Sequence, residues 1–426
     1  MYINILETGA VADGKTVNTA SIQAAIDRCA EAGGGRVEIP AGVFVSGSIW
    51  LKSHVELYLS QGAVLKASGD LDDYNALDAY PQNYNWPPEE WVGKHLIIAV
   101  EQTDIAVSGH GVIDGSGDLF FGEIRPSWGT YAWSYGVSLA KDKEKLRPGQ
   151  LMVIVECDHV RVTDVTFRNT PCWACFLHGC EYAWIRGICV QNEKHYCNSD
   201  GIDIDTCRFV TVSDCIVDTG DDAIAIRCAS KRILKDWDTC EHIAISNCVL
   251  GSCSSVFRFG VGTGTIRSVN ISNINMFRGA VGLNLMTAYL KSGNVSMEDI
   301  HFSNITTDKV AFPVKLTEYN NTYIKDITID GLHAKSMCGI SMYADDPGSI
   351  HDITFRNVDL ELIEPPFPVK ENELKERGDA VVSGKNVRDI RFENVNICIP
   401  ENQKHKWRVN SEFTECENIV VKDSNL

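Results

Sequence analysis

The sequence lacks any apolar run long enough to cross a membrane, and no low-complexity or Pro/Ser-rich stretch divides it. It also has fewer cationic than acidic side chains, 39 Lys and Arg against 57 Asp and Glu, which gives a net charge of −18. This imbalance argues against nucleic acid or an anionic membrane as a partner. The first residues, Met1–Glu7, contain no basic segment and no apolar signal core. We therefore expect a cytoplasmic protein, or a secreted one whose signal has been removed.

What the sequence has in abundance is one six-residue pattern that returns eleven times, roughly 23 to 37 residues apart after a first long gap. It reads apolar, any, apolar, any, a turn-forming Asn, Asp or Gly, and then usually an apolar residue or Cys. Alternating apolar residues predict a strand with one buried face, and the fifth residue suits a following turn because it tolerates left-handed backbone angles. The copies begin at Ile105, Val160, Ala183, Val210, Ile243, Val269, Ile300, Ile327, Ile353, Ile390 and Ile419.

This spacing predicts a solenoid in which each coil stacks on the one before it. We expect an all-β protein, a right-handed parallel β-helix, with residues 1–426 forming a single domain. Residues 1–50 differ and predict a short amphipathic helix after Asn18 or Thr19, with one apolar stripe, that caps the open end of the solenoid. The stripe consists of Ile22, Ala25, Ile26 and Cys29.

Sixteen cysteines are present, but Cys172 and Cys175 form a C-x-x-C pair without a second pair at zinc spacing. Seven others recur at equivalent repeat positions, where we expect reduced, buried thiols that pack as small apolar groups. Disulfides and a metal site stay open as alternatives, and we expect no metal ion and no other cofactor. The recurring cysteines are Cys157, Cys180, Cys207, Cys240 and Cys416, three residues before a hexad, and Cys215 and Cys248, at its sixth position.

Two stretches break the repeat, at about 72–95 and 116–150, and both are rich in aromatic residues. Insertions in solenoids become loops on the binding side, where aromatic rings can stack on sugars. Packing of the rings onto the solenoid body is an equally good interpretation. A third excursion, at about 362–385, predicts a solvated loop. The aromatic residues are Tyr74, Tyr80, Tyr84, Trp86 and Trp91, then Trp128, Tyr131, Trp133 and Tyr135.

The residues that carry chemistry form two acidic clusters, Asn198–Asp203 and Thr219–Arg227, with Asp200 and Asp221 about one coil apart. Stacked carboxylates repel one another, so a purely structural protein has little reason to hold them together. A glycosidase does, because one carboxylic acid protonates the leaving oxygen while an ionised partner activates water. Turn formation and calcium binding are the alternatives. Asp203 and Asp205 alternate with isoleucines, so we expect them to face outward without a catalytic role.

Four segments together resemble the polygalacturonase family of glycoside hydrolases, family 28, over residues 3 to about 330. They are Gly109–Gly115, Asn169–Trp173, Asn198–Asp200 and Gly220–Asp222. The resemblance implies an inverting hydrolysis. Asp221 would then be the general acid, and Asp200 and Asp222 would deprotonate the attacking water.

The sequence departs from that family where its members usually have Gly-His-Gly and then Arg-Ile-Lys, whose cations bind a galacturonate carboxylate. Ser255 stands in place of the histidine, and Asn284 and Met286 replace the two cations. A neutral amide and a thioether cannot pair with a carboxylate. Ordinary endo-polygalacturonase activity is therefore not expected.

Arg258 is the residue that we expect to bind a substrate carboxylate or to pair with Asp222. Alternation also allows it a place on a solvated face, with Phe257 and Phe259 inside. His178 is either on the substrate side or a core histidine. Further substrate-side candidates are Asn198, Arg227, Lys231, Lys315, Tyr319 and, with weaker support, His195.

The leading hypothesis is an exo-acting glycoside hydrolase that trims pectin-derived oligosaccharides of galacturonate or rhamnogalacturonan type. One alternative is a polysaccharide lyase, with Arg227 or Arg258 as a base near calcium-held carboxylates. Another is a non-catalytic carbohydrate-binding or adhesin-like β-helix. The sequence does not choose among oligomeric states.

Overall fold

A computed structural model describes residues 1–125, 136–289, 293–364 and 379–426. The chain divides into two compact units, which we describe separately. The first contains residues 1–126, 136–221 and 232–236, and the second contains residues 127–135, 222–231 and 237–426. Among the described residues, no helix has the length and apolar character needed to cross a membrane.

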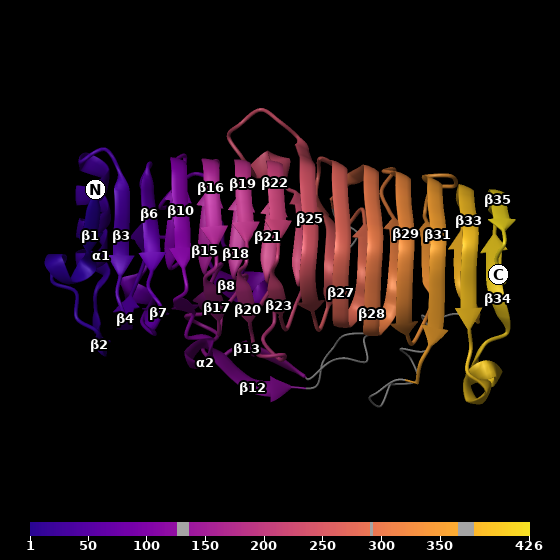
Figure 1. The fold of residues 1–426 in the computed structure, drawn as a ribbon, viewed down its shortest axis with the longest axis horizontal. Coiled ribbons are helices and arrows are strands. Elements are labelled where there is room, and N and C mark those ends of the chain that lie inside the picture. Colours follow the sequence, from indigo (N-terminus) through magenta and orange to yellow (C-terminus); the bar gives the residue numbers. More distant parts are fainter. Residues whose placement is uncertain (126–135, 290–292, 365–378) are drawn as a thin grey trace. The chain divides into compact units, whose positions relative to one another are not determined.

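The first unit consists of parallel strands that pair coil by coil in three stacks, as Figure 1 shows for β1 to β22. The first stack is β1 (Tyr2–Asn4), β3 (Gly35–Ile39), β6 (Val55–Leu59), β10 (Thr103–Gly109), β16 (Asp158–Thr163), β19 (Glu181–Arg186) and β22 (Arg208–Ser213). The second is β2 (Asp13–Val17), β4 (Gly42–Ser46), β7 (Ala63–Ala67), β11 (Val112–Asp114), β17 (Thr166–Arg168), β20 (Cys189–Gln191) and β23 (Ile216–Asp218). The third is β5 (Ile49–Trp50), β9 (Ile97–Val100), β15 (Met152–Val155), β18 (Cys175–His178) and β21 (Ile202–Asp205).

The second unit also consists of stacked parallel strands, which are longer and form two stacks. One stack is β25 (Thr239–Gly251), β27 (Thr265–Met286), β28 (Ser296–Glu318), β29 (Ile324–Ser336), β31 (Ile350–Leu362), β33 (Val387–Cys398) and β35 (Glu417–Lys422). The other joins β24 (Ile224–Cys228) and β26 (Ser255–Gly262) to the ends of β27 and β28, then to β30 (Ile340–Ala344), β32 (Ala380–Lys385) and β34 (Val409–Thr414). The predicted parallel β-helix is confirmed.

The fifth residue of each predicted hexad adopts the left-handed conformation that its chemistry favours. All eleven have positive φ, from 48° at Asp423 to 109° at Gly109. Asn and Asp tolerate this region better than other residues with a Cβ atom, and Gly enters it without steric cost. The hexad therefore encodes a strand and the turn that ends it.

The predicted N-terminal helix is α1 (Thr19–Glu31), and its buried residues are the four of the expected stripe. It packs against η1 (Ile5–Thr8) and against β1, β3, β5 and β6 at the start of the solenoid. Asn18 occupies the N-cap position but does not cap with its side chain. Its amide instead exchanges hydrogen bonds with the backbone of Val11, at 2.7 and 3.1 Å. The side chain of Asn18 therefore binds the loop before the helix instead of capping the helix.

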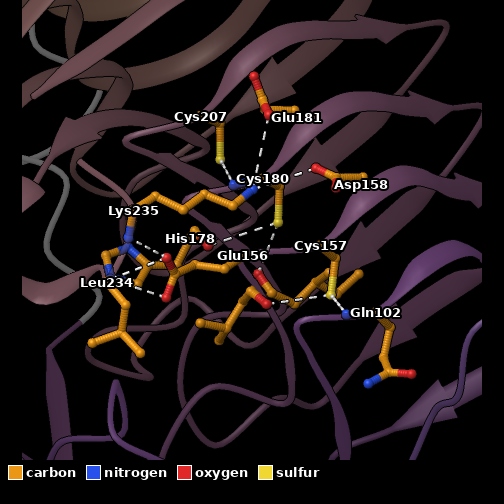
Figure 2. A network of polar contacts seen from close by, with 12 residues as sticks. Gln102, Glu156, Cys157, Asp158, His178, Cys180, Glu181, Cys207, Leu234 and Lys235 are labelled. Atoms are coloured by element: carbon orange, nitrogen blue, oxygen red, sulfur yellow. Dashed lines mark hydrogen bonds and ion pairs between the residues drawn. The ribbon is translucent and has the colours of Figure 1, made fainter. Parts of the chain in front are cut away.

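All sixteen cysteines are free thiols, most of them are buried, and those that precede the hexads on successive coils stack on one another. The backbone N–H of Cys180 donates to Sγ of Cys207 at 3.3 Å, as Figure 2 shows. Burial raises the pKa of Cys157 and Cys175 far above the ordinary range, so these thiols stay neutral. The predicted packing role is confirmed for Cys157, Cys180, Cys207, Cys215, Cys240 and Cys248, which are buried, whereas Cys416 is partly exposed.

The two predicted insertions lie side by side in the first unit, because β8 (Trp91–Val92) pairs with β14 (Arg147–Pro148). The first also contains η2 (Leu71–Asp73) and η3 (Pro87–Glu89). The second contains α2 (Gly117–Phe120) and the antiparallel pair β12 (Phe121–Arg125) and β13 (Val137–Ala140). Two further short helices, η4 (Ser230–Arg232) and η5 (Glu401–Lys406), follow β24 and β33.

Candidate active site

Asp200 and Asp221 lie together in the first unit, as their spacing of one coil predicts. Asp200 lies two residues before the start of β21 and is buried, and its carbonyl oxygen accepts the N–H of Ala174 at 2.9 Å. Asp221 follows β23 and is partly buried. A carboxylate oxygen of Asp200 and one of Asp221 lie within 4.8 Å of each other.

The two acidic loops are joined by a short series of hydrogen bonds. The N–H of Asn198, a residue with φ of 52°, donates to Oδ2 of Asp221 at 3.0 Å. The N–H of Gly220 donates to Oγ of Ser199 at 3.1 Å. A Cβ atom on Gly220 would lie 2.5 Å from the carbonyl oxygen of Tyr196, so only glycine lets the loops approach this closely. The Gly of the Gly-Asp-Asp motif is therefore a packing requirement of the site.

The oxygens of these two carboxylates lie close enough together to share a metal ion. Carboxylate oxygens suit a hard cation such as Ca²⁺. The short distance between the two carboxylates is therefore compatible with proton transfer and with binding of a cation.

Asp222 follows Asp221 in the chain and belongs to the second unit, where it contacts the residue that replaces the family histidine. Its Oδ1 accepts the N–H of Ser255 at 2.8 Å. Oγ of Ser255 in turn accepts a hydrogen bond from the side-chain amide of Asn284 at 3.0 Å. Two of the positions that depart from the family pattern are thus connected to this carboxylate.

Arg258 lies on the outer face of β26, opposite the core. Phe257 and Phe259 are fully buried inside, and Arg258 stands in register with Ala225 on one side and Asn284 on the other. It is only 5% exposed, so the interpretation that placed it on a solvated face is wrong. Its Nη2 lies 3.6 Å from Sδ of Met286.

The next strand adds a second cation to this face, because Lys315 stands in register with Asn284. Its Nζ lies 4.9 Å from the centroid of the Phe312 ring, and the side chain is partly exposed. Arg258, Asn284 and Lys315 therefore form a row across three strands of the second unit. This row presents two cations where the family pattern has one Arg and one Lys on a single strand.

His178 is buried in the first unit and faces Asp205 on the next coil. Its Nδ1 lies 3.8 Å from Oδ2 of Asp205, and its ring stacks on Phe176 at 5.5 Å. Asp203 and Asp205 point away from the core, as predicted, because Ile202 and Ile204 occupy it. Both aspartates are nevertheless buried, so other groups cover this face of β21.

The remaining candidates are dispersed. Arg227 lies half-buried on β24, and Lys231 is exposed in η4. The N–H of Tyr319 donates to Oγ1 of Thr287 at 2.8 Å. His195 borders the second insertion, since its carbonyl oxygen accepts the N–H of Ser138 at 2.7 Å.

Most aromatic residues of the first insertion pack onto the body of the first unit. Tyr80 and Trp91 are buried in one cluster with Trp173 and Phe176, and Tyr84 packs against it. Trp86 is 40% exposed and is the member that could reach a sugar ring. Trp128, Tyr131, Trp133 and Tyr135 of the second insertion lie outside the described residues.

Sequence reasoning missed Arg147, which is fully buried at the junction of the two insertions. Its Nη2 donates to Oδ1 of Asn198 at 2.6 Å and to the carbonyl oxygen of Glu89 at 2.8 Å. Its Nη1 donates to the carbonyl oxygen of Pro171. Nothing in the basic stretch from Lys141 to Arg147 distinguishes this arginine, since its partners lie 24 to 58 residues away.

Curated proteins with similar sequences provide a comparison for this chain. An exo-poly-alpha-D-galacturonosidase from Dickeya chrysanthemi is 30% identical over 258 residues, which are 52% of this chain and 41% of that protein. An endo-polygalacturonase from Pectobacterium carotovorum subsp. carotovorum is 24% identical over 370 residues, 82% of this chain and 85% of that protein. The chain spans less than half the length of the first two curated relatives that it matches.

Among solved structures, a family 28 exopolygalacturonase from Yersinia enterocolitica has the same fold, with a TM-score of 0.76 and 21% identity. The match covers 98% of this chain and 78% of that one. The sequence model for glycosyl hydrolases family 28 matches residues 29–321, more than half of this chain. The chain belongs to glycosyl hydrolases family 28.

Proposed function

We propose that this chain is a glycosidase that hydrolyses polygalacturonan or related pectic oligosaccharides. The observation that carries the proposal is the pair of carboxylates Asp200 and Asp221, with oxygens within 4.8 Å of each other in a hydrogen-bonded loop junction. Two such groups can divide the work of acid and base. The names of the relatives from Dickeya and Pectobacterium support the substrate class.

In this mechanism Asp221 is the general acid. The N–H of Asn198 donates to Oδ2 and orients the carboxyl group, whose proton passes to the leaving oxygen as the glycosidic C–O bond breaks. As the family resemblance implies, the carboxylates of Asp200 and Asp222 take a proton from the water whose oxygen bonds to the anomeric carbon. The products are a shortened chain with a new hydroxyl group and a free sugar.

We propose inversion at the anomeric carbon, as the family resemblance implies. Inverting carboxyl groups usually lie about 6.5–9.5 Å apart and retaining ones about 5–5.5 Å. The 4.8 Å approach of oxygens on Asp200 and Asp221 is shorter than the first range. This limit applies to single oxygens and not to the separation of the two carboxyl groups, so the anomer formed first decides between the two outcomes.

We further propose that the enzyme acts on chain ends. Support comes from the first insertion, whose Trp91 packs on Trp173, next to the Ala174 that binds the carbonyl of Asp200. A rigid loop beside the acidic pair can close one end of a groove. The exo-acting relative from Dickeya supports this mode, whereas the endo-acting relative from Pectobacterium supports internal cleavage.

Substrate recognition would use Arg258 and Lys315 in place of the missing Arg-Ile-Lys. Arginine presents a planar fork that matches a carboxylate, and lysine adds a point charge. Both lie on the strand face that carries Asn284, which is linked through Ser255 to Asp222. We therefore propose a uronate at the sugar position that this row contacts.

The test is incubation of the wild type, Asp221→Asn and Asp218→Asn with galacturonate and rhamnogalacturonan oligomers. Asp218 is the matched control, a partly exposed aspartate paired with Lys194 at 2.6 Å. Loss of a positioned general acid lowers the rate about 10²- to 10⁴-fold. Products read by mass and by proton NMR should be single terminal sugars of inverted configuration. Internal fragments overturn exo-action, the retained anomer overturns inversion, and an unsaturated product identifies a lyase.

A further inference from the structure

Arg147 is a charged side chain with no exposed surface. It is the first residue of β14 in the second insertion, and its guanidinium lies 5.1 Å from the centroid of the Phe121 ring. A charge buried this completely is unfavourable unless neighbouring dipoles replace its water shell. The groups that replace this water shell therefore show which segments the Arg147 side chain holds together.

Its hydrogen-bond acceptors come from three segments that are distant in the sequence. The carbonyl of Glu89 belongs to the first insertion, and the carbonyl of Pro171 belongs to the Asn-Thr-Pro-Cys-Trp motif. The third acceptor is Oδ1 of Asn198, in the loop before Asp200. A planar guanidinium with five donors can bind three such acceptors at once, whereas an ammonium group cannot reproduce the fork.

The bond to Asn198 leads to the proposed general acid in one further step. Arg147 Nη2 holds the side-chain oxygen of Asn198 at 2.6 Å, and the N–H of the same residue donates to Oδ2 of Asp221 at 3.0 Å. Asn198 adopts a left-handed backbone with φ of 52°. This conformation directs its N–H, and the anchored amide side chain keeps it in place.

We propose that Arg147 is a positioning residue for Asp221, acting through Asn198. It fixes the residue whose N–H binds Oδ2, and so holds the carboxyl group of Asp221 in the orientation from which the proton is transferred. It also ties the first insertion to the same junction through Glu89. The inference rests on the proposed hydrolase function, because only that function gives Asp221 a proton to deliver.

A purely structural clamp would predict a different pattern of effects. If Arg147 only joined the insertions to the body, its loss would lower stability or weaken substrate binding and would leave turnover intact. A positioning role lowers kcat in a folded enzyme at nearly constant KM. The two roles therefore separate in the kinetic constants.

The experiment compares Arg147→Lys with Arg168→Lys, using a galacturonate trimer as the substrate. Arg168 is a matched control, since it lies three residues before Pro171 and pairs with Asp114 at 2.8 Å. Displacement of a reacting group by about 1 Å can cost about 10²-fold in rate. We expect Arg147→Lys to lower kcat about 10- to 100-fold with KM changed less than about twofold, and Arg168→Lys to change neither. An unchanged kcat in folded Arg147→Lys overturns the proposal.

A double-mutant cycle of Arg147→Lys with Asn198→Ala tests whether Arg147 acts on Asp221 through Asn198. If Arg147 acts through Asn198, the double variant is no slower than the slower single variant. Independent losses that multiply overturn the route. A fall in kcat that merely follows the unfolded fraction, measured by circular dichroism at the assay temperature, also overturns the positioning role.

Assays of the wild type distinguish failure of the proposed hydrolase function from failure of the proposed role of Arg147. If the wild type turns over no pectic oligomer, the proposed function fails, and crystal structures of the wild type and Arg147→Lys still test the geometry. Loss of the Asn198 N–H bond to Asp221 in the variant supports the inference. An unchanged bond overturns it.

Discussion

The carboxylate of Glu156 accepts the backbone N–H of Lys235 at 2.7 Å, across 79 residues of sequence. The same carboxylate accepts the N–H of Leu234 at 3.0 Å, and Figure 2 shows both bonds. Glu156 is buried, so these N–H groups and the amide of Gln82 replace its water. One side chain thus secures the loop after η4 and the first insertion to the body of the first unit.

Glu156→Ala should release this loop. Hydrogen bonds to a charged group contribute about 1.5–3 kcal/mol each, and the freed N–H groups regain water only after the loop opens. We expect a lower unfolding temperature and faster amide exchange at Leu234 and Lys235, measured by hydrogen–deuterium exchange. Glu181→Ala is the control, because Glu181 meets Lys235 only through a pair of side-chain charges 3.9 Å apart. Equal exchange in the two variants contradicts the anchoring role.

His95 should make the stability of the protein depend on pH. Its Nδ1 lies 2.9 Å from the carbonyl of Gln150, which favours the imidazolium. Burial nevertheless dominates and lowers the pKa from 6.5 to about 4. The unfolded chain therefore binds more protons between these values, so stability falls as the pH falls from 6.5 towards 4.

The measurement is the apparent unfolding temperature of the wild type and of His95→Gln between pH 4 and pH 6.5, the window set by the two pKa values. We expect a shallower pH slope in the variant, since a shift of this size corresponds to roughly 3 kcal/mol in the wild type. His54→Gln, which removes a histidine with a 55% exposed side chain, is the control. Parallel slopes for His95→Gln and the wild type would show that other groups cause the acid sensitivity.

Gly220→Ala should damage the site through sterics alone. An added methyl group would lie 2.5 Å from the carbonyl of Tyr196 and 2.7 Å from that of Glu193. Overpacking of this kind costs about 1–3 kcal/mol and would push the loop of Asp221 away from Asn198. Gly122→Ala, whose nearest neighbour would be 3.4 Å away, is the control. Wild-type turnover and thermal stability in Gly220→Ala would contradict the close-approach argument.

Arg258→Met should weaken recognition of carboxylate-bearing substrates. A charge-assisted hydrogen bond of about 1.5–3 kcal/mol corresponds to about 10- to 100-fold in affinity. We expect KM to rise by about this factor for galacturonate oligomers and to change little for their methyl esters. Arg267→Met, which removes an arginine paired with Glu241 at 2.6 Å, is the control. An equal rise in KM for acid and ester would assign Arg258 a packing role.

The sequence alone predicted those parts of the molecule that repeat or that act within a few residues. The hexad predicted the coil and its left-handed fifth residue, because alternation and turn chemistry depend on local backbone angles. The apolar stripe predicted α1 for the same reason. The stacking of successive coils also carried Asp200 next to Asp221, since it converts a spacing of about one coil along the chain into proximity.

The tertiary structure decided everything that depends on insertions, which follow no period. Arg147 meets Asn198 across 51 residues, and Glu156 meets Lys235 across 79, so neither pair leaves a local pattern. The sequence also could not decide the role of Tyr80 and Trp91, because an aromatic ring can stack on a sugar or pack in a core. Their buried neighbours in the structure show that they pack. Burial decides such cases, because a buried charge or ring takes its role from the groups that replace its water.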